Sequence, residues 1–144
     1  METVKISFDV IPSDPLCPLG IEIWLDNTAL LKNYHVQEKI EFLHTLNDND
    51  GERELRIVML GKTTDYTEID SVGNIIKDST LKIVNVMIDD QDVNQLFLEK
   101  CVYTHDFNGT QPEIQDTFYG IAGCNGTISF KFTTPIYLWL LENM

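Results

Sequence analysis

Two short acidic runs contain the residues of this sequence that are best suited to hold a metal ion. Asp48 and Asp50 stand just before a glycine, and Asp89, Asp90 and Asp92 follow a long apolar run. Calcium takes several oxygen ligands from carboxylates, amides and backbone carbonyls. These five aspartates are therefore candidate calcium ligands if the two runs meet at one end of the fold, and solvated turns if they do not.

The first acidic run imitates the middle of an EF-hand loop but lacks its end ligands. When Gly51 is aligned with the glycine of such a loop, Leu46 takes the first ligand position and Ile57 takes the bidentate one. Neither side chain has an oxygen to offer. An EF-hand is thus excluded, and no cofactor is predicted apart from calcium bound between loops.

Trp24 is the candidate residue for carbohydrate binding. It shares one face of the run 21–25 with Glu22, opposite the apolar residues of that run. An exposed indole beside a carboxylate can stack on the apolar face of a sugar ring while the acid accepts hydrogen bonds from hydroxyls. A second sheet or a loop can instead cover the same indole, so both interpretations stay open.

Residues 135–144 carry apolar side chains around most of a short predicted helix. The spacing predicts a helix over 136–143, with Thr134 as its cap and Pro135 in its first turn. A helix that is apolar on every side has more surface to bury than one sheet can cover. The segment either closes the end of its own sandwich or serves as an apolar anchor on a partner or a second copy. The candidate partner-binding residues are Tyr137, Trp139, Leu140 and Met144.

The residues required for catalysis do not form a recognisable pattern. His35, His44 and His105 are the candidates for proton transfer near neutral pH, and none belongs to an HExxH pair. No GxSxG nucleophile turn and no glycine-rich phosphate-binding motif occurs. Carboxylates for glycoside hydrolysis cannot be identified by counting among 23 acidic residues. The sequence therefore predicts a protein that is not an enzyme.

Charge and composition restrict the partners and the size of the fold. The 144 residues include 23 acidic and 10 basic side chains, for a formal net charge of −13. A field of that sign repels nucleic-acid phosphates and anionic membrane surfaces, so neither is a predicted partner. A hydrophobic content of 43% is enough for one packed domain over 1–144. Three widely spaced cysteines, no secretory leader and no membrane-spanning run predict a soluble protein with reduced thiols.

Alternation of apolar and polar residues with period two is the main structural signal, and no strand–helix–strand rhythm accompanies it. The Asp-Gly pair at 50–51 predicts a hairpin between the runs 36–46 and 55–60, and residues 62–79 predict a long loop or a ragged edge ribbon. The predicted fold class is all-β, an antiparallel, jelly-roll-like β-sandwich with a short C-terminal helix. The runs expected as strands are 4–10, 21–25, 36–46, 55–60, 81–88, 96–98, 101–103, 118–121 and 127–132.

Three of these runs resemble the strands of small β-sandwich carbohydrate-binding modules, several of which depend on calcium. The resemblance lies in residues 20–26, 54–60 and 81–89. It implies a sandwich that binds a glycan, with Trp24 as a contact residue and calcium as the associated ion.

The C-terminal run 126–132, followed by residues 135–144, is similar to the endings of small structural proteins of tailed bacteriophages that infect marine cyanobacteria. This resemblance implies a virion structural or accessory protein, such as a capsid decoration, fibre or tail component. Its partners would be other virion proteins or copies of itself, in the virion and in the host cytoplasm during assembly. The virion protein is the main interpretation, and the calcium-dependent carbohydrate-binding module is the alternative.

Overall fold

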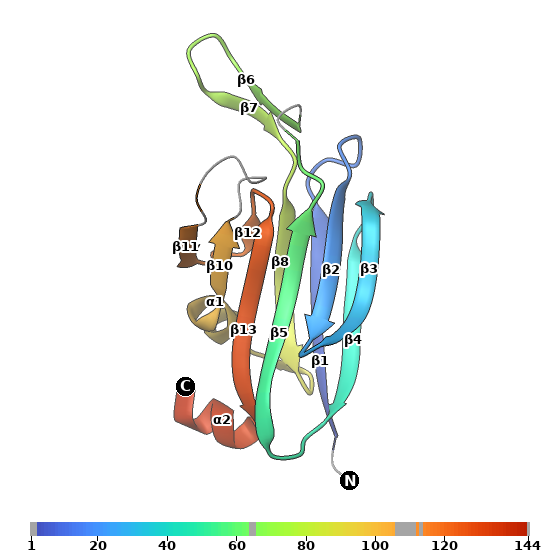
Figure 1. The fold of residues 1–144 in the computed structure, drawn as a ribbon, viewed down its shortest axis with the longest axis vertical. Coiled ribbons are helices and arrows are strands. Elements are labelled where there is room, and N and C mark those ends of the chain that lie inside the picture. The colour runs from blue at the N-terminus through green and yellow to red at the C-terminus, as the bar shows by residue number, and fades with distance from the viewer. Residues whose placement is uncertain (1–2, 64–65, 106–111, 113, 144) are drawn as a thin grey trace.

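Two antiparallel sheets lie face to face in the computed structural model, which describes residues 3–63, 66–105, 112 and 114–143 (Figure 1). Among these residues, sheet A has the strand order β12–β8–β1–β4, with β9 paired to β8, and sheet B has the order β11–β10–β13–β5–β2–β3. Sheet A comprises β1 (Thr3–Pro12), β4 (Ile40–Asn47), β8 (Leu81–Ile88), β9 (Gln91–Asp92) and β12 (Ile121–Ala122). Sheet B comprises β2 (Leu19–Leu25), β3 (Thr28–Val36), β5 (Gly51–Leu60), β10 (Val102–His105), β11 (Ile114–Thr117) and β13 (Gly126–Thr134). The predicted all-β, jelly-roll-like sandwich with a short C-terminal helix is confirmed.

The core forms where the apolar sides of the alternating strands face each other. In β1 every second residue from Val4 to Val10 is buried, and the residues between them are more exposed. The Phe8 ring meets Phe42 of β4 with centroids 4.7 Å apart. Strand β13 buries Ile128 from the opposite sheet in the same way. Alternation along each strand therefore leaves one polar outer face on each sheet.

The predicted hairpin at the Asp-Gly pair is wrong. Strand β4 pairs with β1 in sheet A, whereas β5 pairs with β2 and β13 in sheet B. The turn at residues 48–50 therefore carries the chain from one sheet to the other. Each of the two strands buries its apolar side in the shared core. The same alternation would arise if the two strands were paired in one sheet or lay in opposite sheets, so it does not distinguish a hairpin from a crossing.

Three other expectations about elements also differ from the structure. Of the run 118–121, expected as a strand, only Ile121 lies in one, β12. Residues 96–98 belong to a helix, α1 (Asn94–Lys100), in which Phe97 is buried with its ring 5.1 Å from that of Phe130. An apolar run of three residues cannot distinguish a strand from a helix. Strand β3, which was not expected, is an edge strand with mostly exposed side chains and so lacks the alternation that marks β1.

A two-stranded ribbon projects beyond the sandwich at one end (Figure 1). It consists of β6 (Thr67–Ile69) and β7 (Ile75–Asp78), which confirms the edge ribbon expected within 62–79. The Lys62 ammonium ties its base to the sandwich, with Nζ 2.6 Å from Asp78 Oδ1 and 2.5 Å from the Gly123 carbonyl.

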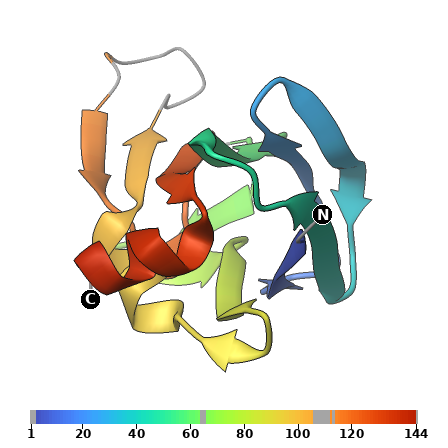
Figure 2. The ribbon, with the colours of Figure 1, turned by 90° about the horizontal axis from the view of Figure 1, so that it is seen from below.

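The C-terminal helix α2 (Ile136–Asn143) lies across the other end of the sandwich, as Figure 2 shows. Its first backbone amide, at Ile136, donates to Asp48 Oδ1 at 2.8 Å. The residue that caps the helix therefore comes from the distant β4–β5 turn, and the expected cap, Thr134, lies in β13. In the described part of the chain no helix has the length and apolar character needed to cross a membrane.

Candidate functional site

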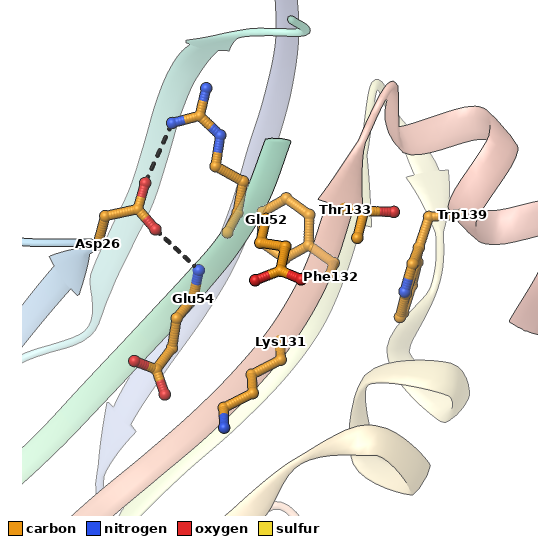
Figure 3. Close-up of a pocket in the computed structure, with 8 residues that line it drawn as sticks. Asp26, Glu52, Glu54, Lys131, Phe132, Thr133 and Trp139 are labelled. Carbon is orange, nitrogen blue, oxygen red and sulfur yellow. Dashed lines mark hydrogen bonds and ion pairs between the residues drawn. The ribbon is translucent and has the colours of Figure 1, made fainter. Parts of the chain in front are cut away.

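An open groove of about 490 Å³ lies at one end of sheet B, where β5 and β13 meet α2 (Figure 3). Its floor is formed by the outward side chains at the start of β5 and the end of β13. Its lining residues are Asp26, Glu52, Arg53, Glu54, Lys131, Phe132, Thr133 and Trp139.

Strand register brings the polar groups of the groove together. Glu54 of β5 stands opposite Lys131 of β13, and Glu52 stands opposite Thr133. Opposite charges at paired positions attract each other across an antiparallel ladder. Glu52, Lys131 and Thr133 are exposed, so their carboxylate, ammonium and hydroxyl groups face solvent in the groove.

Asp26 fixes one wall of the groove. It follows β2 with φ of 53°, a conformation that aspartate and asparagine tolerate better than most residues. Its carboxylate accepts hydrogen bonds from the Glu54 amide and from Arg53 Nη1, each at 3.0 Å. The Arg56 guanidinium donates to its carbonyl at 2.8 Å. These bonds join the end of β2 rigidly to β5.

Glu54 is held at both carboxylate oxygens. Ser129 donates a hydrogen bond to Oε2 at 2.6 Å, and Arg56 Nε lies 3.7 Å from Oε1. Across the groove stands the indole of Trp139, as Figure 3 shows. The groove thus combines preoriented acceptors, a cation and a hydroxyl with the edge of an aromatic ring. Sites of this composition hold small polar molecules that also carry apolar faces.

Trp24 lies beside this groove and not in it. The indole is half-buried on the same outer face, where Nε1 donates to Glu22 Oε1 at 3.0 Å. Two cations lie over its ring, Lys32 Nζ at 5.2 Å and Arg56 Cζ at 5.7 Å from the centroid. A sugar that stacked on Trp24 would have to displace one of these side chains.

Glu22 is the acceptor that holds this arrangement. The Tyr34 hydroxyl donates to Oε2 at 2.5 Å, and this bond, followed by that from Trp24, lowers the pKa of Glu22 below its ordinary value. The same bond raises the pKa of Tyr34. Glu22 is therefore engaged within the protein, and the role of Trp24 in carbohydrate binding stays a prediction.

The two acidic loops do lie near each other. Both approach Tyr137 of α2, whose hydroxyl donates to Asp89 Oδ2 at 2.8 Å. This hydrogen bond, with smaller effects from burial and from the charges of Asp89 and Asp48, raises the pKa of Tyr137. The loops thus share one end of the sandwich, as the calcium prediction required.

Most carboxylates of these loops already have partners within the protein. Asp89 Oδ1 accepts from the Lys5 amide at 2.8 Å, and Asp92 Oδ1 accepts from the Asn94 amide at 2.9 Å. Asp90 faces the Lys5 ammonium at 3.6 Å, and Asp48 caps α2. Nowhere in the described ranges do three or more His, Cys, Asp or Glu side chains form a group suited to a metal. Protein donors thus occupy at least one oxygen of Asp48, Asp89 and Asp92, whereas Asp50 is exposed in its turn, and calcium binding at these loops stays a prediction.

Because most of these carboxylates already have partners, millimolar calcium is expected to leave the melting temperature within about 1 °C of its value in excess chelator. A ligand that binds the folded state alone would raise it by mass action. Differential scanning calorimetry with each addition measures the difference. If calcium raises the melting temperature by several degrees, and Asp89→Asn abolishes that rise, calcium does bind at the loops.

The structure divides the candidate partner-binding residues of α2. Trp139 and Leu140 are buried in the protein's own core, whereas Tyr137 is 42% exposed. Met144 lies outside the described residues. Leu138 and Leu141, which the sequence did not indicate as partner-binding residues, are more exposed than Tyr137, at 59% and 78%. A partner at this helix stays a prediction, and it would have to contact this outer side.

The groove residues were not identified from the sequence. The signal for them in the sequence is that polar residues recur at every second position in two runs, at Glu52 and Glu54 and at Lys131 and Thr133. That signal becomes a site only once β5 and β13 are known to be neighbours.

Comparison with known proteins places the fold. No protein-family model matches the chain, and neither does any curated protein. Among solved structures, the calcium-dependent carbohydrate-binding module vCBM60 superposes with a TM-score of 0.54 at 12% identity, covering 88% of this chain and 89% of that one. The complex of vCBM60 with galactobiose gives a TM-score of 0.52 at 13% identity, with 88% and 96% covered. The chain thus has the β-sandwich fold seen in a carbohydrate-binding module.

Proposed function

We propose that this protein is a non-catalytic carbohydrate-binding module that holds a short neutral glycan in the groove between β5, β13 and α2. The observation that carries the proposal is the cluster of Glu52, Lys131 and Thr133, which presents acceptors and donors side by side next to the Trp139 indole. Sugar hydroxyls both donate and accept, and sugar rings have apolar faces, so this set matches their chemistry. The similarity in fold to vCBM60, solved with galactobiose, supports the same class of ligand.

The charge of the groove and of the chain favours a neutral glycan. Asp26, Glu52 and Glu54 contribute carboxylates to the lining, and Arg53 is already paired with Asp26. With a formal net charge of −13, the protein would also repel a sulfated or uronic-acid polymer at a distance.

Binding without hydrolysis follows from where the acids lie. Glu52 and Glu54 both project from β5, on one side of the groove, and Ser129 and Arg56 hold the Glu54 carboxylate. Glycoside hydrolysis by two carboxylates requires them on opposite sides of the bond that breaks.

Substitution of Glu52 by alanine is the test of this proposal. The variant is expected to lose about 10-fold or more in affinity for its glycan, because a charged acceptor of sugar hydroxyls is removed. Isothermal titration calorimetry with galactobiose and with neutral oligosaccharides selected on a glycan array measures the change.

Glu41→Ala is the matched control, since Glu41 is an exposed acid on β4 of the other sheet. It should bind as the unmodified chain does, and a chelator should change neither affinity. Failure of every neutral glycan to bind, or an equal loss in both variants, would refute the proposal.

The virion interpretation rests on the resemblance of the C-terminal run and stays a prediction, as does a location in the virion and host cytoplasm. A role in a particle is compatible with glycan binding, because a decoration or fibre protein can carry a glycan-binding groove. Mass spectrometry of purified particles that finds the chain in many copies would establish it.

A further inference from the structure

A cysteine, a histidine and an aspartate lie in successive contact at the β11–β10 side of sheet B, away from the groove. Cys124 Sγ is 2.7 Å from His105 Nδ1, and His105 Nε2 is 3.3 Å from Asp116 Oδ2. His105 ends β10, Asp116 lies in β11, and Cys124 lies between β12 and β13. Since β10 is hydrogen-bonded to both β11 and β13, the sheet itself brings the three together.

Tyr103 holds both members of the Cys–His contact. Its ring stacks on that of His105, with centroids 4.0 Å apart and an interplanar angle of 24°. Its hydroxyl donates to the Cys124 carbonyl and accepts from the Cys124 amide at 3.2 Å. The imidazole and the cysteine backbone are thus fixed relative to each other.

Gly126 allows the close approach of the strands at this point. A Cβ at this position would lie 2.2 Å from the Thr104 carbonyl oxygen of β10. The absence of a side chain lets the start of β13 lie against β10, and this places Cys124 beside His105.

The three groups are arranged so that a proton can pass between the thiol and the imidazole, with the carboxylate on the other side of the ring. Cys124 and Asp116 meet different nitrogens of the His105 ring, and these two nitrogens point in divergent directions. One ion cannot be ligated by both from those positions. A base held by a carboxylate on one side and facing a thiol on the other is the arrangement that activates a nucleophile.

We propose that Cys124 is an activated thiol that undergoes exchange with small disulfides, and that His105 and Asp116 position and stabilise its thiolate form. The Cys124 proton moves to His105 Nδ1, and the imidazolium that results is paired with Asp116. The thiolate attacks one sulfur of the disulfide, whose S–S bond breaks as the new one forms. The second sulfur leaves as a thiolate and takes a proton from solvent, so the protein ends as a mixed disulfide.

The other two cysteines lack these features and serve as internal references. Cys101 is buried, and burial raises its pKa far above the ordinary value. Cys17 lies by the Asp14 carboxyl, to which its thiol contributes a hydrogen bond. An imidazole beside a thiol is one of the settings in which a cysteine becomes reactive.

The test measures how fast oxidised glutathione modifies each cysteine, by mass spectrometry of peptides after timed quenching. In the unmodified chain Cys124 is expected to react first. At pH 6, His105→Gln should slow its modification about 10-fold, because an ordinary thiol is then almost wholly protonated. At pH 9 the two rates should nearly coincide. Asp116→Asn, on an exposed strand, should slow the reaction at pH 6 in the same sense.

Cys101 reports whether a variant is folded, since it reacts only after the core opens. Modification of Cys101 in His105→Gln would mean that this variant has opened its core. The proposal is then judged on the result for Asp116→Asn alone. Equal rates for Cys124 and Cys17 at pH 6, or a Cys124 rate that neither substitution changes, would overturn the proposal. Neither outcome would affect the glycan-binding proposal, because that proposal rests on the groove residues and not on Cys124.

Discussion

Replacement of Trp139 by alanine is expected to lower the free energy of unfolding by about 3–5 kcal/mol. Trp139 is 8% exposed, and its ring meets Phe130 edge to face with centroids 5.4 Å apart. Phe132 lies at 6.3 Å on the same side. Loss of the indole would leave a cavity at the end of the sandwich that the two rings cannot fill, because β13 fixes them.

Denaturant titration followed by circular dichroism measures this loss. Leu141→Ala is the matched control, since Leu141 lies on the same helix but is 78% exposed, and it should change stability by less than about 0.5 kcal/mol. For the same reason, deletion of residues 135–144 should unfold the sandwich. If Trp139→Ala remains as stable as the unmodified chain but loses self-association, Trp139 is an interface anchor and not part of the core.

Local alternation was sufficient to predict the strands that bury one face. The runs that became β1 and β13 show period two because each has one side in the core and one in solvent. In β8 the alternation shifts at Asn85, which has a φ of 57°, so that Leu81 and Ile83 and then Val86 and Ile88 are buried. Edge strand β3 escaped prediction because both its faces are largely exposed, so it carries no such signal. The crossing from β4 to β5 was not predicted, because the choice of partner strand depends on residues far apart in the chain.

The candidate site depends even more on distant residues. Glu54 and Lys131 meet only through the β5–β13 register, and no property of either residue in the sequence indicates the other. For Trp24, parity correctly predicted the outer face, but the cations over its ring come from β3 and β5. The aspartates were sound candidates by type, and their hydrogen bonds to backbone amides became apparent only in the folded chain.

Replacement of Asp78 by alanine is expected to cost about 3 kcal/mol, the second large effect. Lys62 is 9% exposed, and the carboxylate that neutralises it is 28% exposed. Removal of Asp78 would take away the carboxylate that lies 2.6 Å from this buried ammonium. Asp78 also accepts a hydrogen bond from Thr67 at 2.7 Å, so the base of the β6–β7 ribbon would loosen as well.

The pH dependence of this contribution has a defined sign. Burial alone would raise the pKa of Asp78, but the hydrogen bonds from Lys62 and Thr67 and the charge of Lys62 outweigh it and lower the pKa. A carboxyl with a lowered pKa in the folded state contributes its stability above the ordinary aspartate value, and loses it as pH falls through the folded one. The contribution is thus complete above about pH 5, and it declines as pH falls below about 4 toward the folded value.

Denaturant titrations of Asp78→Ala at several pH values, with Glu68→Ala of the same ribbon as the exposed acidic control, measure both effects. The difference between Asp78→Ala and the unmodified chain should shrink below about pH 4, whereas the control should differ little at any pH. Adding Lys62→Met to Asp78→Ala should recover part of the lost stability, because no charge is then left buried. If the double variant is less stable than Asp78→Ala, the main role of Lys62 is its bond to the Gly123 carbonyl, and the ion pair does not dominate at this junction.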